Sequence, residues 1–141
     1  MSITKVKWSG NMEFDAELNG HHFIIDADAS SGGEDKGPRP KGLLLSGLAG
    51  CTGMDVVSIL KKMKVENYNL TIEIDAEMTQ EHPKIYHTIF LDYSFEGKNL
   101  PEDKLKRAVE LSETKYCGVS AMLRKAAEIK SRILLNGKEI E

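Results

Sequence analysis

One long segment, Lys41 to Met63, constrains the fold more than any other part of this chain. It predicts a helix, and Pro40 stands just ahead of its first turn, where proline is favoured. Leucine, methionine, valine and isoleucine occur almost all around its first turns, which indicates a helix buried on most sides. Gly47, Gly50 and Gly53 recur every three residues, and each costs about 1 kcal/mol relative to alanine within a helix. We therefore expect another element to approach this helix closely and offset that cost.

The segments around this helix alternate between apolar and polar residues as strands do. Leu70 to Met78 has an apolar residue at every second position, and the range 85–95 repeats this period. Asn19-Gly20 favours a two-residue hairpin turn. The other predicted elements are strands at 3–8, 12–18, 22–26 and 129–135, a helix from Pro101 to a break at Tyr116-Cys117-Gly118, and a short helix at 120–128. This order predicts a single α+β domain over residues 1–141, with a mostly antiparallel sheet covering a buried central helix.

Composition narrows the classes of function. The net charge of −3 comes from interspersed signs without a basic patch, so we expect no nucleic-acid partner. The apolar range 43–60 contains Ser46, Thr52, Asp55 and Ser58, which argues against a membrane span. The first residues lack the apolar core of a signal peptide, so we expect a cytoplasmic location. Thiols are kept reduced there, and a disulfide would be transient.

No pattern of a metal or cofactor site is present in the sequence. The glycine-rich and proline-rich range 27–40 lacks the Gly-Lys-Ser/Thr ending of a phosphate-binding loop. Ser46 lacks the first glycine of a nucleophile elbow. The histidines lack the spacing of zinc ligands; they are His21, His22, His82 and His87. We therefore expect neither a metal nor a cofactor.

Two cysteines remain as the candidates for chemistry. Each could be a small core residue, since free cysteines are often buried. Cys51 lies mid-helix in an apolar segment, which suits that reading. Cys117 precedes Gly118 and opens a helix, where the N-terminal partial charge favours a thiolate, so local physics predicts Cys117 as the more acidic thiol. Asp55 and Glu113 each stand four positions from a cysteine, and the pattern assigns them no role.

The segments around both cysteines resemble the OsmC/Ohr family of small thiol proteins. The first segment runs Gly-Pro-Arg-Pro from Gly37, continues through Leu-Leu-Leu-Ser-Gly-Leu-Ala-Gly to Cys51, and ends Thr-Gly-Met-Asp; the second is Lys-Tyr-Cys-Gly-Val-Ser around Cys117. The resemblance covers essentially the whole chain and implies an intertwined homodimer with the two long helices at its centre. It also implies reduction of organic hydroperoxides, with Cys51 as the peroxidatic thiol and Cys117 as the resolving thiol. Their disulfide would be reduced by an external dithiol, of the lipoyl type in the family.

This sequence departs from the family's peroxidases at two places. Those peroxidases carry a glutamate ten residues before the first cysteine, and this chain has Lys41 at that position. They also use an arginine from their N-terminal strands, whereas residues 1–38 of this chain contain no arginine. A thiolate in an apolar pocket needs a nearby cation. The candidates to stabilise it are Arg39, Lys41 and Arg124, in that order. The same departures leave an alternative open, in which the protein binds a small apolar or thiol-reactive ligand in the dimer-interface pocket and is no peroxidase.

Overall fold

The computed structural model of the protein describes residues 3–141. Its internal contacts divide the chain into two compact units, Met1–Ser46 and Gly47–Glu141. The expectation that residues 1–141 form a single domain stays a prediction.

The first unit is a three-stranded antiparallel sheet with a long loop. Its strands are β1 (Thr4–Gly10), β2 (Glu13–Leu18) and β3 (His21–Ile25), in the order β1-β2-β3. The predicted hairpin at Asn19-Gly20 is confirmed, since both residues have positive φ angles of 53° and 80°. The loop contains a short 3-10 helix, η1 (Ala29–Ser31).

Backbone hydrogen bonds to one buried carboxylate organise that loop. Asp26 accepts the N–H groups of Ala27 at 2.8 Å and of Glu34 and Lys36 at 3.2 Å each. Burial opposes the charged form of Asp26, but these backbone bonds hold its pKa below the ordinary value of 3.8. The carboxylate therefore stabilises the loop in its ionised form.

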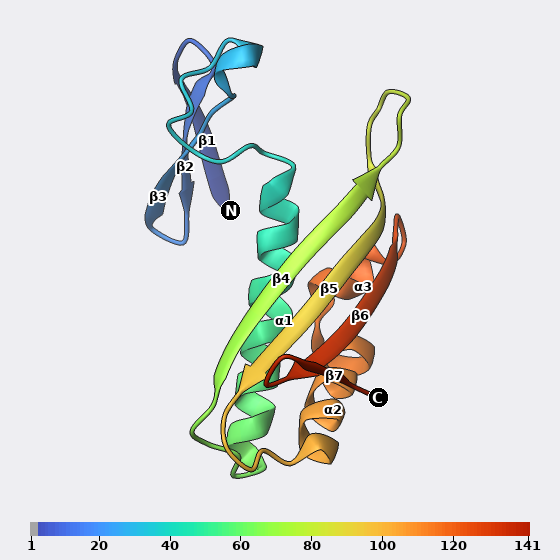
Figure 1. The fold of residues 1–141 in the computed structure, drawn as a ribbon. Coiled ribbons are helices and arrows are strands. Elements are labelled where there is room, and N and C mark those ends of the chain that lie inside the picture. The colour runs from blue at the N-terminus through green and yellow to red at the C-terminus, as the bar shows by residue number, and fades with distance from the viewer. Residues whose placement is uncertain (1–2) are drawn as a thin grey trace. The chain divides into compact units, whose positions relative to one another are not determined.

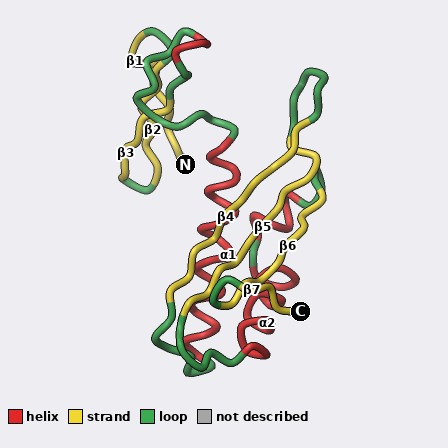
Figure 2. Tube along the Cα trace, in the orientation of Figure 1, coloured by secondary structure: helices red, strands yellow, loops and turns green. Residues whose placement is uncertain are grey.

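The second unit is a four-stranded mixed sheet with helices (Figures 1 and 2). The strands are β4 (Asn69–Met78), β5 (Tyr86–Glu96), β6 (Glu128–Leu135) and β7 (Lys138–Ile140), in that order across the sheet. The β4–β5 and β6–β7 pairs are antiparallel, whereas β5 and β6 are parallel. The chain crosses over between β5 and β6 through α2 (Glu102–Leu111), the π-helical turn η2 (Ser112–Tyr116) and α3 (Gly118–Leu123).

Most predicted elements are confirmed, and three details differ. The strands form two sheets, and the second sheet has one parallel pair, because a helical crossover returns the chain in the same direction. The short helix predicted at 120–128 ends at Leu123, and turns at 124–126 lead into β6. The π-helical turn η2 and the strand β7 were not predicted.

The long helix α1 (Gly42–Lys62) buries one face in this chain. Leu48, Thr52, Val56 and Leu60 are its buried residues, and they recur every four positions. On another side of the helix, Met54 is 76% exposed. Within a single chain the helix is therefore buried on one face, and not on most sides as expected.

The glycines and the apolar length of α1 have separate explanations. A Cβ at Gly53 would stand 3.1 Å from Cδ1 of Ile72 in β4, which confirms a close approach there. Added Cβ atoms at Gly47 and Gly50 would meet nothing within 4 Å among residues 3–141. By length and composition alone α1 could cross a membrane. Core helices pass the same test, and the packed face of α1 contributes to the core of the second unit.

Candidate functional site

The fold brings the two cysteines together. Cys51 lies in the middle of α1, and Cys117 is the N-cap residue of α3. The two Sγ atoms and a carboxylate oxygen of Asp55 all lie within 4.8 Å of one another. A disulfide needs a separation of about 2 Å between sulfurs, so only local adjustment separates this arrangement from a covalent bond.

The two thiols stand in different surroundings. Cys51 is half-buried, whereas Cys117 is only 4% exposed. Burial raises the pKa of the Cys117 thiol, and a side-chain hydrogen bond with Cys51 acts in the same direction. The N–H of Ser120 at the start of α3 donates to Cys117 Sγ at 3.3 Å and lowers the pKa, as expected for a helix N-terminus, but burial outweighs it. The expectation that Cys117 is the thiol activated by its position is therefore corrected.

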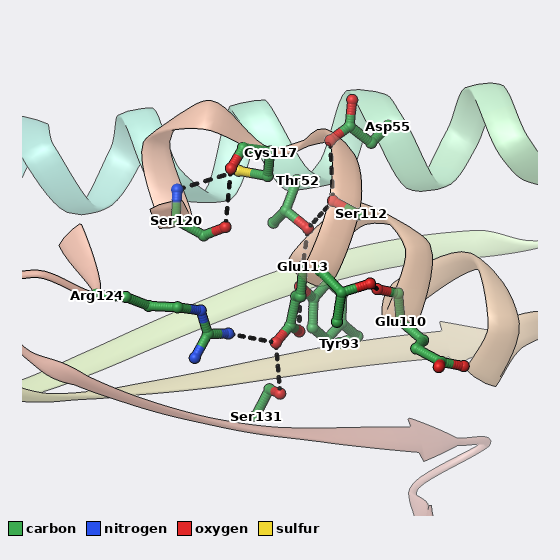
Figure 3. A network of polar contacts seen from close by, with 11 residues as sticks. Thr52, Asp55, Tyr93, Glu110, Ser112, Glu113, Cys117, Ser120, Arg124 and Ser131 are labelled. Carbon is green, nitrogen blue, oxygen red and sulfur yellow. Dashed lines mark hydrogen bonds and ion pairs between the residues drawn. The ribbon is translucent and has the colours of Figure 1, made fainter. Parts of the chain in front are cut away.

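Behind the thiols, three fully buried hydroxyl groups connect Asp55 to Glu113 (Figure 3). Ser112 Oγ lies 2.9 Å from Asp55 Oδ2 and 2.7 Å from Thr52 Oγ1. Thr52 Oγ1 is 2.8 Å from the hydroxyl of Tyr93, which is 2.8 Å from Glu113 Oε2. Burial raises the pKa of the Tyr93 phenol, so this hydroxyl keeps its proton and donates to Glu113.

Two further donors hold the other carboxylate oxygen of Glu113. Arg124 Nη2 donates to Glu113 Oε1 at 3.1 Å, and Ser131 Oγ of β6 donates to the same atom at 3.0 Å. The Glu113 side chain is 9% exposed. Figure 3 shows the guanidinium of Arg124 directed at Glu113. Arg124 therefore has a carboxylate partner on the far side of the hydroxyl groups from Asp55.

The other two candidate cations belong to the first unit. Arg39 Nη2 pairs with Asp35 at 2.7 Å, and its Nη1 donates to the carbonyl oxygen of Gly37 at 2.7 Å. Lys41 lies in the turn that precedes α1. Arg39 and Arg124 each pair with a carboxylate. The roles of Arg39, Lys41 and Arg124 toward Cys51 stay predictions.

Sequence reasoning missed the buried hydroxyl groups. Thr52 stands in the apolar run of α1, Ser112 at an apolar position of the α2 pattern, and Tyr93 at an inward position of β5. Polar residues at core positions are a detectable signal, because buried polar groups need hydrogen-bond partners. Their partners lie on other elements, which the sequence pattern alone does not identify.

The cluster of two thiols and one carboxyl is one ligand short of a structural zinc centre, which has four. We assign no metal to it. A cavity beside the cluster is lined by Asp55 and Tyr116 together with Ile59, Lys62 and Leu111, among others. This largely apolar lining can receive an organic molecule beside Asp55, although neither cysteine lines the cavity.

Comparisons with known proteins agree with this architecture. The family described as OsmC-like protein matches residues 33–132. Protein YhfA of Escherichia coli K12 is 34% identical over 126 residues, covering 89% of this chain and 91% of the relative. A crystal structure of a hypothetical protein from Aquifex aeolicus VF5 has a TM-score of 0.83 and 30% identity, with 96% and 98% of the two chains covered. The organic hydroperoxide resistance protein OhrB of Bacillus subtilis shares the fold, with a TM-score of 0.62, 20% identity, and 94% and 97% coverage.

Proposed function

We propose, since this chain belongs to the OsmC-like protein family, that it reduces organic hydroperoxides with its two cysteines. One observation carries the proposal: the fold places Cys51 Sγ, Cys117 Sγ and a carboxylate oxygen of Asp55 within 4.8 Å of one another, although the cysteines are far apart in sequence. Two thiols at this distance can alternate between the dithiol and the disulfide.

The surroundings of the two thiols support different roles. Cys51 is the more exposed, and we assign it the attack on the peroxide. Its sulfur takes the terminal oxygen and becomes a sulfenic acid, and the substrate leaves as an alcohol. Cys117 is buried and its pKa is raised, which suits a thiol that waits for the sulfenic acid. It then attacks Cys51, forms the disulfide and releases water.

An external dithiol then restores both thiols by disulfide exchange. We propose a dithiol of the lipoyl type, as the family resemblance implies, and a cytoplasmic location, where free cysteines persist. The mostly apolar cavity beside Asp55 favours hydroperoxides with alkyl or acyl chains over hydrogen peroxide. The exposed apolar side of α1 supports a homodimer through this helix.

The assay is consumption of tert-butyl hydroperoxide with dihydrolipoamide as the reductant. Cys51→Ser should abolish turnover, and Cys117→Ser should trap a sulfenic acid on Cys51, which dimedone labels. Wild-type protein treated with one equivalent of peroxide should yield a Cys51–Cys117 disulfide within one subunit, identified by peptide mass. A sulfenic acid that forms on Cys117 in Cys51→Ser at the wild-type rate would reverse the roles.

We further propose that a loop cation stabilises the Cys51 thiolate. The candidates are Arg39 first and Lys41 second, because a guanidinium has the fork geometry that a lysine lacks. In a Cys117→Ser background, Arg39→Ala should move the thiolate titration of Cys51 upward by about one pH unit or more. Lys36→Ala in the same loop is the matched control, since Lys36 is paired with Glu13 and Glu34. If the Cys51 titration is unchanged in both the Arg39 and the Lys41 variants, this loop does not stabilise the thiolate.

A second candidate function is binding of a small apolar or thiol-reactive ligand without peroxidase turnover. The observation that favours it is Lys41 at the position where the family's peroxidases carry glutamate. In that case tert-butyl hydroperoxide would neither be consumed nor form the disulfide. A thiol-reactive ligand would still modify Cys51, whose Sγ lies within 4.8 Å of a carboxylate oxygen of Asp55.

A further inference from the structure

The hydroxyl groups between Asp55 and Glu113 contain fewer hydrogens than their contacts require. Four oxygen–oxygen contacts of 2.7–2.9 Å run from Asp55 through Ser112, Thr52 and Tyr93 to Glu113. These are ordinary lengths for O–H···O hydrogen bonds, and each such bond needs one hydrogen. Three hydroxyl groups supply three hydrogens.

The fourth hydrogen must come from one of the two carboxyl groups. Without it, one contact would bring the lone pairs of two buried oxygens together at hydrogen-bond distance. Thr52, Tyr93 and Ser112 are fully buried, so water cannot satisfy that contact. The geometry therefore indicates that Asp55 and Glu113 share one proton through the three hydroxyl groups.

The surroundings of the two carboxyl groups decide where this proton resides. Glu113 Oε1 accepts hydrogen bonds from the guanidinium of Arg124 at 3.1 Å and the hydroxyl of Ser131 at 3.0 Å. Its Oε2 accepts one from the hydroxyl of Tyr93. A guanidinium is always charged, so Glu113 is the carboxylate. Asp55 is then the carboxylic acid. In that form it donates to Ser112 Oγ, whereas an ionised Asp55 would accept from Ser112, and every hydroxyl group donates toward Glu113.

A proton on Asp55 also suits the thiols beside it. A carboxylate within 4.8 Å of both sulfurs would oppose a thiolate by like-charge repulsion, whereas a neutral carboxylic acid does not. The other titratable groups that line the same cavity are Lys62 and Tyr116. Asp55 is the carboxyl group that lies beside both sulfurs.

The two ends of this path open to different cavities. Asp55 lines one cavity together with Lys62 and Tyr116, and Glu113, Arg124 and Ser131 line a separate cavity. A proton can therefore enter at Glu113 and reach Asp55 through the core of the second unit without passing through the cavity that Asp55 lines.

We propose that Asp55 is held as a carboxylic acid and is the proton donor of the thiol site, resupplied from Glu113 through Tyr93, Thr52 and Ser112. The three hydroxyl residues are positioning residues in this scheme. The chemical step rests on the proposed function. The Cys51 thiolate attacks the terminal oxygen of the hydroperoxide, an S–O bond forms, and the O–O bond breaks. The alkoxide that leaves takes the proton of Asp55.

Asp55 regains its proton in two stages, and the number of protons is conserved in each. Its carboxylate first turns the hydroxyl groups of Ser112, Thr52 and Tyr93 toward itself, and Glu113 takes a proton from solvent. Each hydrogen then moves to the next oxygen along the path, which leaves Glu113 ionised and Asp55 protonated. One proton passes from solvent to the alcohol product in each turnover.

Infrared spectroscopy of the reduced protein tests the location of the proton. Wild-type protein should show the carbonyl stretch of a protonated carboxylic acid at neutral pH, and Asp55→Asn should lack it. Tyr93→Phe should lack it as well, because two hydroxyl hydrogens then suffice for the two contacts that remain beside Asp55. Asp92→Asn is the matched control and should keep the band, since Asp92 pairs with Arg132 on the sheet. Identical wild-type and Asp55→Asn spectra would overturn the inference.

Thiolate titration and kinetics test the donor role. The amide of Asp55→Asn can still donate to Ser112, so the fold is kept and the Cys51 thiolate titration should not move. If Asp55 were ionised, removing its charge would shift that titration downward. The rate of sulfenic acid formation should fall about a hundredfold, the usual minimum for loss of a general acid. An unchanged rate would refute the donor role. Wild-type protein that consumes no hydroperoxide would refute the proposed function, and the carbonyl band would still report on Asp55.

Discussion

Tyr93→Phe is the sharpest test of the buried hydroxyl groups as a stabilising feature. The Tyr93 ring is fully buried on β5, and its hydroxyl lies 2.8 Å from both Thr52 Oγ1 and Glu113 Oε2. Phenylalanine fills the same volume except for one oxygen. The substitution therefore removes two hydrogen bonds and leaves the apolar packing of the ring in place.

The magnitude follows from the partners that the oxygen loses. A hydrogen bond to a charged group contributes about 1.5–3 kcal/mol, and Glu113 is charged. Thr52 is fully buried and keeps Ser112 as its remaining partner, which adds a smaller cost. We expect the free energy of unfolding to fall by about 2–3 kcal/mol in total, which corresponds to roughly 6–15 °C in Tm for a chain of this length.

Urea unfolding followed by circular dichroism measures this change at a fixed protein concentration, because any association shifts the apparent stability. Tyr86→Phe is the matched control in the same strand. Among residues 3–141 the Tyr86 hydroxyl has no hydrogen-bond partner, so its removal should change stability by less than about 0.5 kcal/mol.

A double-mutant cycle with Thr52→Val separates the contact from other effects. Because Thr52 and Tyr93 share a hydrogen bond, the two substitutions should couple by about 0.5–3 kcal/mol. Additive costs, or a Tyr93→Phe cost equal to that of Tyr86→Phe, would refute the reasoning.

Other parts of the molecule give three further tests. Iodoacetamide at neutral pH should alkylate Cys51 before Cys117, because burial shields Cys117 and raises its pKa; peptide mass spectrometry reads the order. Asp26→Asn should lower Tm at neutral pH, and since the folded pKa of Asp26 lies below 3.8, this difference should persist above that pH and vanish as pH falls through the folded value. Wild-type protein should be a homodimer by light scattering at micromolar concentration, and Met54→Lys on α1 should weaken it. Met122→Lys, which changes an exposed methionine on α3, should not.

Local patterns were sufficient to predict most of the fold. The alternation in β4 and β5 and the apolar length of α1 reflect contacts that each element makes along one face, so the sequence records them directly. The parallel pairing of β5 with β6 is different, because it depends on where the crossover through α2 and α3 returns the chain. No period within β6 distinguishes a parallel neighbour from an antiparallel one.

The site was predictable to the level of its cysteines. The resemblance selected Cys51 and Cys117, but their distance from each other and from Asp55 depends on tertiary packing. The direction in which the Cys117 pKa departs from its ordinary value was mispredicted, because the helix N-terminus is visible in the sequence and the burial that opposes it is not. The direction of a pKa shift therefore cannot be predicted from local charges alone, because it also depends on how deeply the group is buried.

Opposite sides of α1 serve the predicted dimer contact and the proposed proton transfer. Thr52 and Met54 stand two residues apart, so they project about 200° apart around the helix. Thr52 is buried against Tyr93 and Ser112, whereas Met54 is 76% exposed. A charge at position 54 should therefore disrupt the contact between two copies and leave the hydroxyl groups intact. Met54→Lys should keep the carboxylic acid band of Asp55 even as a monomer. Loss of that band together with the dimer would show that the second copy, and not this chain alone, holds the proton in place.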